Sequence, residues 1–232
     1  MSDILANLQA VRQRIATAQH ACGRTDPVTL MAVSKTFPAE AVRAAVAAGQ
    51  HCFGENYVQE ALDKMRALAD LRAQLEWHFI GPLQSNKTRQ VAEHFDWVHS
   101  IDRLKLAQRL SEQRPAGLPP LQVCLQVNIS GETTKGGVEP SDVLALAQAV
   151  ALLPNLSLRG LMAVPAPSDN PAEQRHAFSA LRALQDTLLT RGMTVDTLSM
   201  GMSADLESAI AEGATIVRIG TAIFGARPRT TH

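Results

Sequence analysis

The segment Val28-Thr29-Leu30-Met31-Ala32-Val33-Ser34 decides the fold, because it is a nearly unbroken run of apolar residues. Such a run is typical of a strand that is buried on both faces of a parallel sheet. Thr25-Asp26-Pro27 precedes it and ends a helix predicted over residues 3–21, where apolar residues recur at helical spacing. Pro38 follows it and opens a second helix, which Gly49 ends. The sequence therefore predicts a strand followed by a helix, with one additional helix in front.

The same alternation continues to the end of the chain. Further strands are predicted at 52–54, 77–81, 97–100, 121–129, 156–164, 195–200 and 215–219, and helices at 57–71, 85–93, 102–113, 140–153, 172–191 and 203–212, with a short helical turn at 221–224. Asp102 is the predicted cap of the helix over 102–113. Eight strand–helix units predict the α/β class and a (β/α)8 TIM barrel with an extra N-terminal helix. A doubly wound open sheet is the alternative, but it usually has fewer strands and a Gly-rich turn after the first.

Length and composition fit one globular domain. The chain has 232 residues, 22 Lys+Arg against 22 Asp+Glu, and 46% hydrophobic residues, which excludes disorder for most of its length. Zero net charge argues against a general binder of nucleic acid or anionic membranes. We expect a single barrel domain over 1–232 with a frayed tail at 226–232. Eight units consume this length, so we expect no second catalytic domain.

Signals for export, membrane insertion or metal binding are not found in the sequence. The start lacks a basic segment followed by an apolar one, and the most apolar stretch, 143–153, is too short to span a bilayer. Cys22, Cys52 and Cys124 are odd in number and far apart, so they fit neither a disulfide framework nor a metal knuckle. The histidines show no metal-ligand spacing either. We expect a cytoplasmic protein without a metal or a membrane partner.

Lys35 follows the first predicted strand, at the end of the barrel where TIM-barrel chemistry lies. Partial burial there would lower the pKa of its amine and make it nucleophilic, as a Schiff-base lysine requires. The alternative is an exposed lysine at a strand end. The other four lysines lie on polar helix faces, at a helix start and in a Gly-rich loop: Lys64, Lys105, Lys87 and Lys135. Lys35 is therefore the candidate nucleophile.

Two polar residues near the next strands have two interpretations each. Asn56 follows the second strand and would either bind a ligand or cap the next helix, and spacing alone favours the cap. His78 lies within the third strand, where a core histidine with satisfied hydrogen bonds is favoured over a catalytic one.

The last two strands lead into loops that resemble a phosphate site. One loop contains Gly201 and Ser203 after Ser199, and the other contains Gly220 and Thr221 after Arg218. TIM barrels frequently bind phosphate with these two loops, where glycine lets backbone N–H groups approach and hydroxyls add donors. Two tight turns with helix caps are the alternative. Together with a strand-end lysine, the phosphate interpretation indicates a phosphorylated aldehyde, and pyridoxal 5'-phosphate (PLP) fits this description.

Several sequence blocks carry a resemblance to a known family. They are AVSKT (32–36), FGENYVQE (53–60), WHFIGPLQSNK (77–87), LM (161–162), SMGMS (199–203) and VRIGTAIFG (217–225). In this order they resemble the pyridoxal phosphate homeostasis proteins, from the first strand to about residue 227. The resemblance implies a fold-type III PLP barrel, like the N-terminal domain of alanine racemase.

The resemblance also implies roles for site residues. Lys35 would form the Schiff base with PLP, and Asn56 would lie beside the cofactor. Arg218 would face the pyridine nitrogen, where its charge disfavours protonation and weakens the ring as an electron sink. The residues expected to hold the phosphate are Ser199, Ser203, Gly220 and Thr221, with Gly201 in the same loop.

Two functions remain from this resemblance. One is a non-catalytic PLP-binding protein of intracellular PLP homeostasis, a carrier or regulator with PLP-accepting apo-enzymes as candidate partners. The other is a small amino-acid racemase, which needs proton-transfer groups on both faces of the substrate carbon. Alanine racemases use the lysine and a tyrosine from a second domain and the partner subunit, whereas Tyr57 is the one tyrosine here. We favour the non-catalytic function, and a monomer is compatible with it. A nucleic-acid or protein-interaction barrel is third, since Lys87 and Arg89 form only a small basic cluster.

Overall fold

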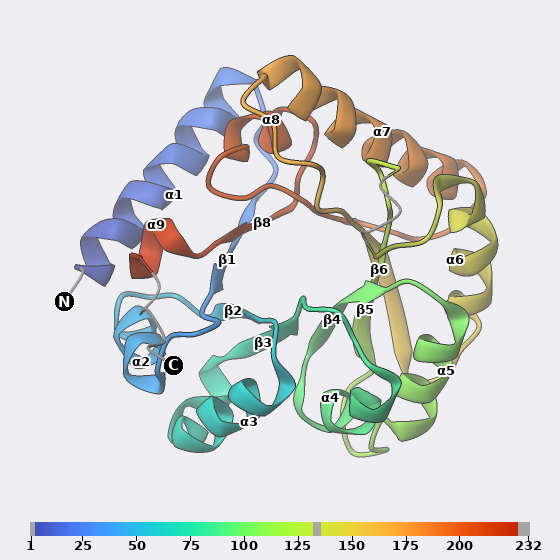
Figure 1. Cartoon of the computed structure of the whole chain (residues 1–232), viewed down its shortest axis with the longest axis horizontal. Helices are drawn as coiled ribbons and strands as arrows, with labels where there is room; N and C mark the ends of the chain where they lie inside the picture. The colour runs from blue at the N-terminus through green and yellow to red at the C-terminus, as the bar shows by residue number, and fades with distance from the viewer. Residues whose placement is uncertain (1–2, 132–135, 227–232) are drawn as a thin grey trace.

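The computed structural model describes residues 3–131 and 136–226 and contains a closed barrel of parallel strands (Figure 1). Its strands are β1 (Thr29–Val33), β2 (Cys52–Glu55), β3 (Glu76–Phe79), β4 (Trp97–Ile101), β5 (Leu121–Gln126), β6 (Leu156–Met162), β7 (Thr197–Ser199) and β8 (Ile216–Ile219). Each strand pairs with the next along the chain, and β1 pairs with β8. This closure confirms the predicted (β/α)8 barrel and excludes the open sheet.

Helices surround the barrel on its outside (Figure 1). They are α1 (Ile4–Ala21), α2 (Ala39–Ala47), α3 (Val58–Ala67), α4 (Thr88–His94), α5 (Leu104–Gln113), α6 (Val143–Ala151), α7 (Pro171–Thr190), α8 (Leu206–Ala211) and α9 (Thr221–Phe224), with short 3₁₀ turns at Ala69–Gln74, Ser85–Lys87 and Pro140–Asp142. The strands predicted at 121–129 and 195–200 are shorter in the structure. The residues beyond their ends belong to loops at the mouths of the barrel.

The extra helix α1 supports the loops at the end of the chain. Its apolar stripe is buried: Leu8, Val11, Ile15 and Ala18. From the same helix, Asn7 Nδ2 donates to the carbonyl of Ile223 in α9 at 2.8 Å. Arg14 Nη2 donates to the carbonyl of Ser203 in the β7–α8 loop at 3.1 Å. The helix thus fixes the two loops that were predicted to bind phosphate.

The barrel interior differs from the aliphatic filling that is usual for this fold. The main apolar cluster packs the helices against the outside of the strands. A separate buried cluster combines side chains of six strands: Met31, Cys52, Trp97, Cys124, Met162 and Ile216. Buried polar side chains accompany it, among them His78, His99, Ser199 and Arg218. Polar side chains therefore occupy part of the barrel interior.

One predicted cap is wrong. The N-cap of α5 is Arg103, and no side chain caps this helix. The Asp102 carboxylate instead accepts a hydrogen bond from Arg103 Nη1 at 2.7 Å, and the helix begins one residue later than predicted for a cap at Asp102. Lys135 and residues 227–232 of the predicted frayed tail lie outside the described residues.

The three cysteines are free thiols in the structure. Within residues 3–131 and 136–226, no helix combines the length and the apolar character needed to cross a membrane.

Candidate functional site

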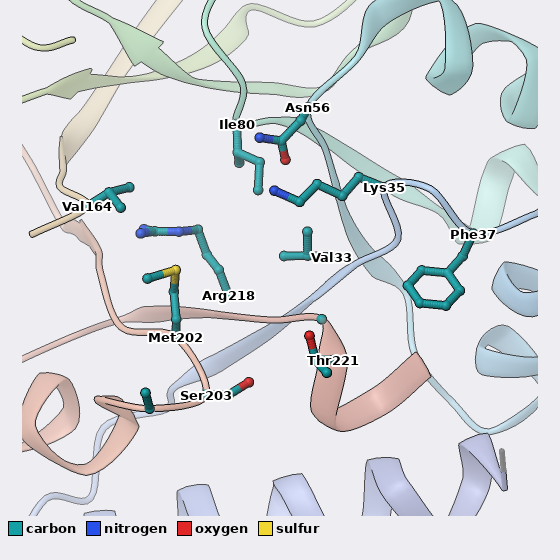
Figure 2. A pocket seen from close by; sticks show the side chains of 12 residues that line it. Val33, Lys35, Phe37, Asn56, Ile80, Val164, Met202, Ser203, Arg218 and Thr221 are labelled. Carbon is teal, nitrogen blue, oxygen red and sulfur yellow. The ribbon is translucent and has the colours of Figure 1, made fainter. Parts of the chain in front are cut away.

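A pocket of about 380 Å³ lies at the C-terminal ends of the strands, where the sequence predicted the site (Figure 2). Its lining comes from the ends of β1, β2, β3, β6, β7 and β8: Val33, Lys35, Phe37, Asn56, Ile80, Val164, Met202, Ser203, Ala204, Arg218, Gly220 and Thr221. The volume is within the range of small-molecule sites. Polar groups converge on an otherwise apolar cavity, which is the usual composition of a cofactor site.

Lys35 extends from the turn after β1 with its amino group inside the pocket, between Val33 and Asn56 (Figure 2). The next residue, Thr36, has a φ of 68°, a left-handed conformation that is uncommon for a residue with a side chain. Its backbone N–H donates to Glu60 Oε1 of α3 at 2.5 Å. The contact with α3 therefore holds the strained turn that aims Lys35.

A buried ionic network lies directly behind this turn. Lys64 Nζ donates to the Ser34 carbonyl at 2.6 Å and contacts Glu55 Oε1 at 2.7 Å and Glu60 Oε1 at 2.6 Å. Ser34 Oγ donates to the same Glu55 oxygen at 2.6 Å. Burial raises the pKa of Glu55, and the charge of Lys64 opposes that shift. The sequence predicts Lys64 on a polar helix face, and the structure adds that this side chain is buried, because its amino group contacts the Ser34 carbonyl and Glu55.

Asn56 belongs to the pocket and not to a helix cap. The N-cap of α3 is Tyr57, and no side chain caps it. Asn56 Oδ1 is buried and accepts no hydrogen bond from any described residue. Gly81 packs so closely against this residue that an added Cβ would lie 2.2 Å from the Asn56 carbonyl oxygen. The turn after β3 therefore fixes Asn56, and its side-chain oxygen remains available to a ligand.

The opposite wall is formed by the loops after β7 and β8. The hydroxyls of Ser203 and Thr221 lie on this wall (Figure 2), and Gly220 joins them. Gly201 does not line the pocket, but its φ of 94° sets the loop, and a Cβ there would lie 2.5 Å from Ala209 Cβ. Asp205 Oδ1 accepts from the Met202 N–H at 2.6 Å and closes the turn. The wall thus combines two hydroxyls with close-packed backbone.

Arg218 supplies a fixed positive charge at the pocket floor. Nη1 donates to the carbonyl and to Oγ of Ser199, at 2.6 and 2.9 Å, and Nη2 donates to the Ala163 carbonyl at 2.8 Å. Burial lowers the pKa of Arg218 to about 10, with the charge of Asp205 opposing the shift, so the group stays cationic at neutral pH. Ser199 is fully buried and outside the pocket lining. Its side chain therefore contacts the site through Arg218.

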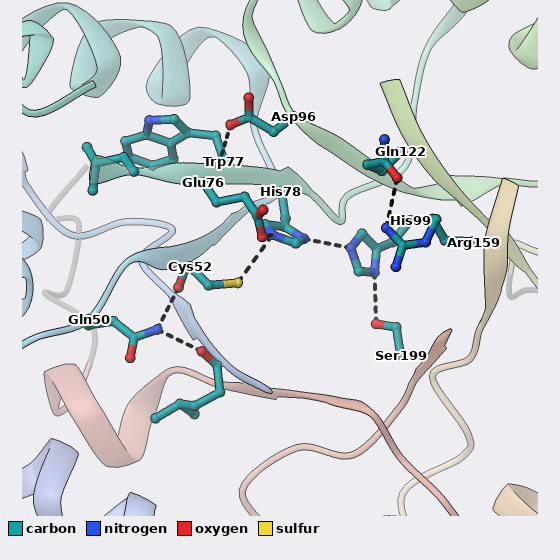
Figure 3. Close-up of polar contacts among 12 residues, drawn as sticks. Gln50, Cys52, Glu76, Trp77, His78, Asp96, His99, Gln122, Arg159 and Ser199 are labelled. Carbon is teal, nitrogen blue, oxygen red and sulfur yellow. Dashed lines mark hydrogen bonds and ion pairs between the residues drawn. The ribbon is translucent and has the colours of Figure 1, made fainter. Parts of the chain in front are cut away.

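Ser199, which Arg218 contacts, begins a chain of hydrogen bonds that runs through the barrel to Glu76, and Figure 3 shows this chain. Ser199 Oγ lies 2.8 Å from His99 Nδ1, and His99 Nε2 lies 2.9 Å from His78 Nδ1. His78 Nε2 in turn lies 2.7 Å from Glu76 Oε1. Burial lowers the pKa of His99 well below its usual value, and the neighbouring His78 and Arg218 lower it further. His78 is therefore a core histidine with satisfied hydrogen bonds, as predicted, and His99 is neutral.

Most of the predicted binding residues lie in one place. Lys35, Asn56, Ser203, Arg218, Gly220 and Thr221 line the pocket, whereas Ser199 and Gly201 lie beneath it. The sequence missed the apolar walls formed by Phe37, Ile80, Val164 and Met202. Ile80 and Val164 follow strand ends, and this position is the sequence signal that could have placed them in the pocket wall. Glu55 and Lys64 carried no signal, because only packing brings them together.

Comparison with known proteins confirms the resemblance. The family profile described as "Alanine racemase, N-terminal domain" matches residues 6–228. The chain is 65% identical to the pyridoxal phosphate homeostasis protein of Pseudomonas aeruginosa over 229 residues, which cover 98% of this chain and 97% of the relative. The chain belongs to the family of pyridoxal phosphate homeostasis proteins. The family assignment rests on nearly the full length of both proteins.

Solved structures agree with this assignment. PipY of Synechococcus elongatus, solved with PLP bound, is 39% identical, with a TM-score of 0.83 over 96% of this chain and 100% of that one. Alanine racemase from Corynebacterium glutamicum is 17% identical, with a TM-score of 0.71 over 100% of this chain but 63% of that one. The racemase comparison supports the shared barrel fold alone.

Proposed function

We propose that this member of the family binds PLP in the pocket at the C-terminal ends of the strands and serves intracellular PLP homeostasis. One observation carries the proposal: Lys35, Arg218 and the hydroxyls of Ser203 and Thr221 face one cavity of suitable size. PLP offers an aldehyde for a lysine amine, a phosphate for the opposite wall and a ring between them. The PLP-bound PipY and the name of the Pseudomonas relative support the same ligand.

The residues of the pocket fit PLP individually. The Lys35 amine would add to the aldehyde carbon, forming a Schiff base as one water leaves. Asn56 Oδ1, which lacks a partner among the described residues, would accept a hydrogen bond from the bound molecule. Ser203, Gly220 and Thr221 would bind the phosphate through hydroxyl and backbone N–H groups. The pocket therefore offers positioned contacts for each part of the ligand.

Arg218 limits what the bound ring can do. PLP chemistry at a substrate carbon depends on the ring as an electron sink. We propose that the guanidinium, held by Ser199 and Ala163, faces the ring nitrogen and keeps it unprotonated, because a positive neighbour opposes a second positive charge. This arrangement favours storage of the cofactor over catalysis of transamination.

The lining of the pocket also argues against racemisation. A racemase needs an acid or base on each face of the substrate carbon. Among the described lining residues, Lys35 has no tyrosine, histidine, cysteine or carboxylate opposite it. Tyr57 is 57% exposed and outside this lining. We therefore propose a non-catalytic barrel domain, with cytoplasmic PLP-requiring apo-enzymes as recipients, and the free cysteines fit a reducing compartment.

The proposal is tested by mixing purified protein with PLP. We expect a yellow complex with a visible Schiff-base band, and borohydride should fix one PLP per chain on the peptide that contains Lys35. Peptide mass spectrometry identifies the labelled lysine. Protein that stays colourless with excess PLP would refute PLP binding. Conversion of L- to D-amino acids by the loaded protein would refute the non-catalytic part alone.

Arg218→Met should weaken PLP binding about 10- to 100-fold, because a buried charged donor is lost, while the Schiff base still forms. Absorbance titration with PLP gives the affinity. Arg218→Lys keeps a charge but not the planar donor pair, so we expect an intermediate loss. Arg43→Met is the control, because Arg43 lies outside the pocket lining and pairs with Asp70. Equal affinity of Arg218→Met and the parent would remove Arg218 from the ligand contacts.

A further inference from the structure

Three side chains of metal-ligand type lie close together (Figure 3), where β2 and β3 begin and hence at the end of the barrel opposite the pocket. Cys52 Sγ lies 3.2 Å from His78 Nε2, and Glu76 Oε1 lies 2.7 Å from the same nitrogen. The sulfur, the nitrogen and the carboxylate oxygen all lie within 4.8 Å of one another. Thiolate, imidazole and carboxylate are the ligands that zinc prefers in proteins.

The register of the sheet produces this cluster. Cys52 of β2 is the direct pairing partner of Glu76 on β3, so their side chains share one face of the sheet. His78 lies two residues after Glu76 and therefore points to the same face. The 23 residues between Cys52 and Glu76 hide this relation in the sequence, because metal-ligand motifs are recognised by short spacings.

One nitrogen of His78 faces the other two ligand atoms of the cluster. A neutral imidazole carries its proton on one nitrogen, and a single N–H on His78 Nε2 has two acceptors within range, Cys52 Sγ and Glu76 Oε1. The sulfur and the oxygen therefore both lie within hydrogen-bond range of the same nitrogen atom. A cation placed between the three atoms would contact all of them after small side-chain rotations.

The surroundings hold the His78 ring in place. Its other nitrogen, Nδ1, lies 2.9 Å from His99 Nε2, and the ring stacks on Trp97 with centroids 5.2 Å apart and an interplanar angle of 13°. A metal-binding histidine usually has its second nitrogen hydrogen-bonded in this manner. With a metal on Nε2, the ring proton resides on Nδ1 and donates to His99.

Access and charge are also suitable. Glu76 is about half exposed and borders a cavity of about 530 Å³, together with Trp97 and Arg159. Arg159 of this cavity is paired with Asp196 at 2.6 Å. Cys52 is buried on the inner side of the three ligand atoms. A divalent ion would displace the thiol proton, and the resulting thiolate and Glu76 would balance its charge.

We propose that Cys52, Glu76 and His78 form a binding site for a divalent transition-metal ion of the zinc class, with a fourth position open to water. Metal binding converts the cysteine thiol to a metal-bound thiolate and releases one proton to solvent. The site lies at the opposite end of the barrel from Lys35, so its existence does not depend on PLP binding.

Cobalt(II) titration of untagged, chelator-treated protein tests the proposal. We expect one cobalt ion per chain, a near-ultraviolet thiolate-to-cobalt absorption band, visible bands of a four-coordinate ion, and displacement by zinc. Cys52→Ala should abolish the thiolate band and weaken binding by more than about 100-fold, which exceeds the usual cost of losing a neighbour of a ligand. Glu76→Gln, at a half-exposed position, should weaken binding without unfolding the protein.

Cys124→Ala is the matched control, because Cys124 is also buried in the barrel interior but does not belong to the group of Cys52, Glu76 and His78. It should leave the cobalt spectrum and affinity unchanged. Absence of the thiolate band in the parent protein overturns the proposal. Equal binding by the parent and Cys52→Ala also overturns it, since the ion would then be held elsewhere. Chelated protein that still takes up PLP confirms that the two sites are separate.

Discussion

Lys35→Ala is expected to abolish covalent attachment of PLP. The amine of Lys35 enters the pocket, and the other lysines of the described residues lie outside its lining. Without this amine, the visible Schiff-base band should disappear, and borohydride should fix no PLP above background. Absorbance titration and mass spectrometry of the reduced protein measure both effects. PLP should still bind non-covalently, because Arg218, Ser203 and Thr221 keep their positions.

Lys105→Ala is the matched control for this substitution, because Lys105 is exposed on α5 and distant in sequence from the pocket residues. It should retain the full band and the full label. If Lys35→Ala still carried one reducible PLP per chain, the reacting amine would lie elsewhere, and the proposed site would be wrong. If Lys35→Ala lost the Schiff-base band and also no longer bound PLP non-covalently, the whole pocket would have collapsed.

The barrel could be predicted because the sequence patterns that specify its strands and helices are local. Each strand is a short apolar run, such as 28–34, and each helix has its own periodicity and end signals. The place of Lys35 followed from the same reasoning, since strand ends gather at one mouth of a barrel. Closure between β1 and β8 then required only that eight such units occur in order.

Other features depend on contacts between segments that are distant in sequence. Asn56 has a sequence context that suits a helix cap, yet α3 begins after Tyr57 and directs Asn56 to the pocket. Cys52 and Glu76 meet only through the register of β2 and β3. Ser199 resembles a phosphate ligand in its loop, but its position at the end of β7 turns it inward to His99 and Arg218. Local patterns contain none of these relations.

Lys64 is the residue for which such contacts between distant segments matter most. Lys64→Met should therefore strongly destabilise the protein. The ammonium group is buried, 5% exposed, between Glu55, which is fully buried, and Glu60. Removing one partner of a buried ion pair leaves an uncompensated charge, so the free energy of unfolding should fall by about 3–5 kcal/mol. This is a large part of the total stability of a typical domain, which is about 5–15 kcal/mol. Urea unfolding followed by circular dichroism measures the loss.

The loss should depend on pH in a defined direction. Burial already raises the pKa of Glu55 in the parent, and without Lys64 the opposing attraction is gone, so that pKa rises further. A carboxyl group whose pKa is higher in the folded protein contributes stability that is fully present below its unfolded pKa. This stability is lost as the pH rises through the folded pKa. The deficit of Lys64→Met should therefore be small in mild acid and reach its full size at neutral pH and above.

Two further variants separate the buried charge from simple loss of packing. Glu55→Gln combined with Lys64→Met removes the uncompensated carboxylate, so the pH-dependent part of the deficit should disappear while any packing loss remains. Lys105→Met, on the exposed face of α5, should change the stability by less than about 0.5 kcal/mol. A deficit of Lys64→Met that is equal in acid and at neutral pH would contradict the argument, because Glu55 would then not carry the cost. Lys64 also donates a hydrogen bond to the carbonyl of Ser34, the residue before Lys35. The network that stabilises the barrel therefore also fixes the turn that carries the reactive lysine.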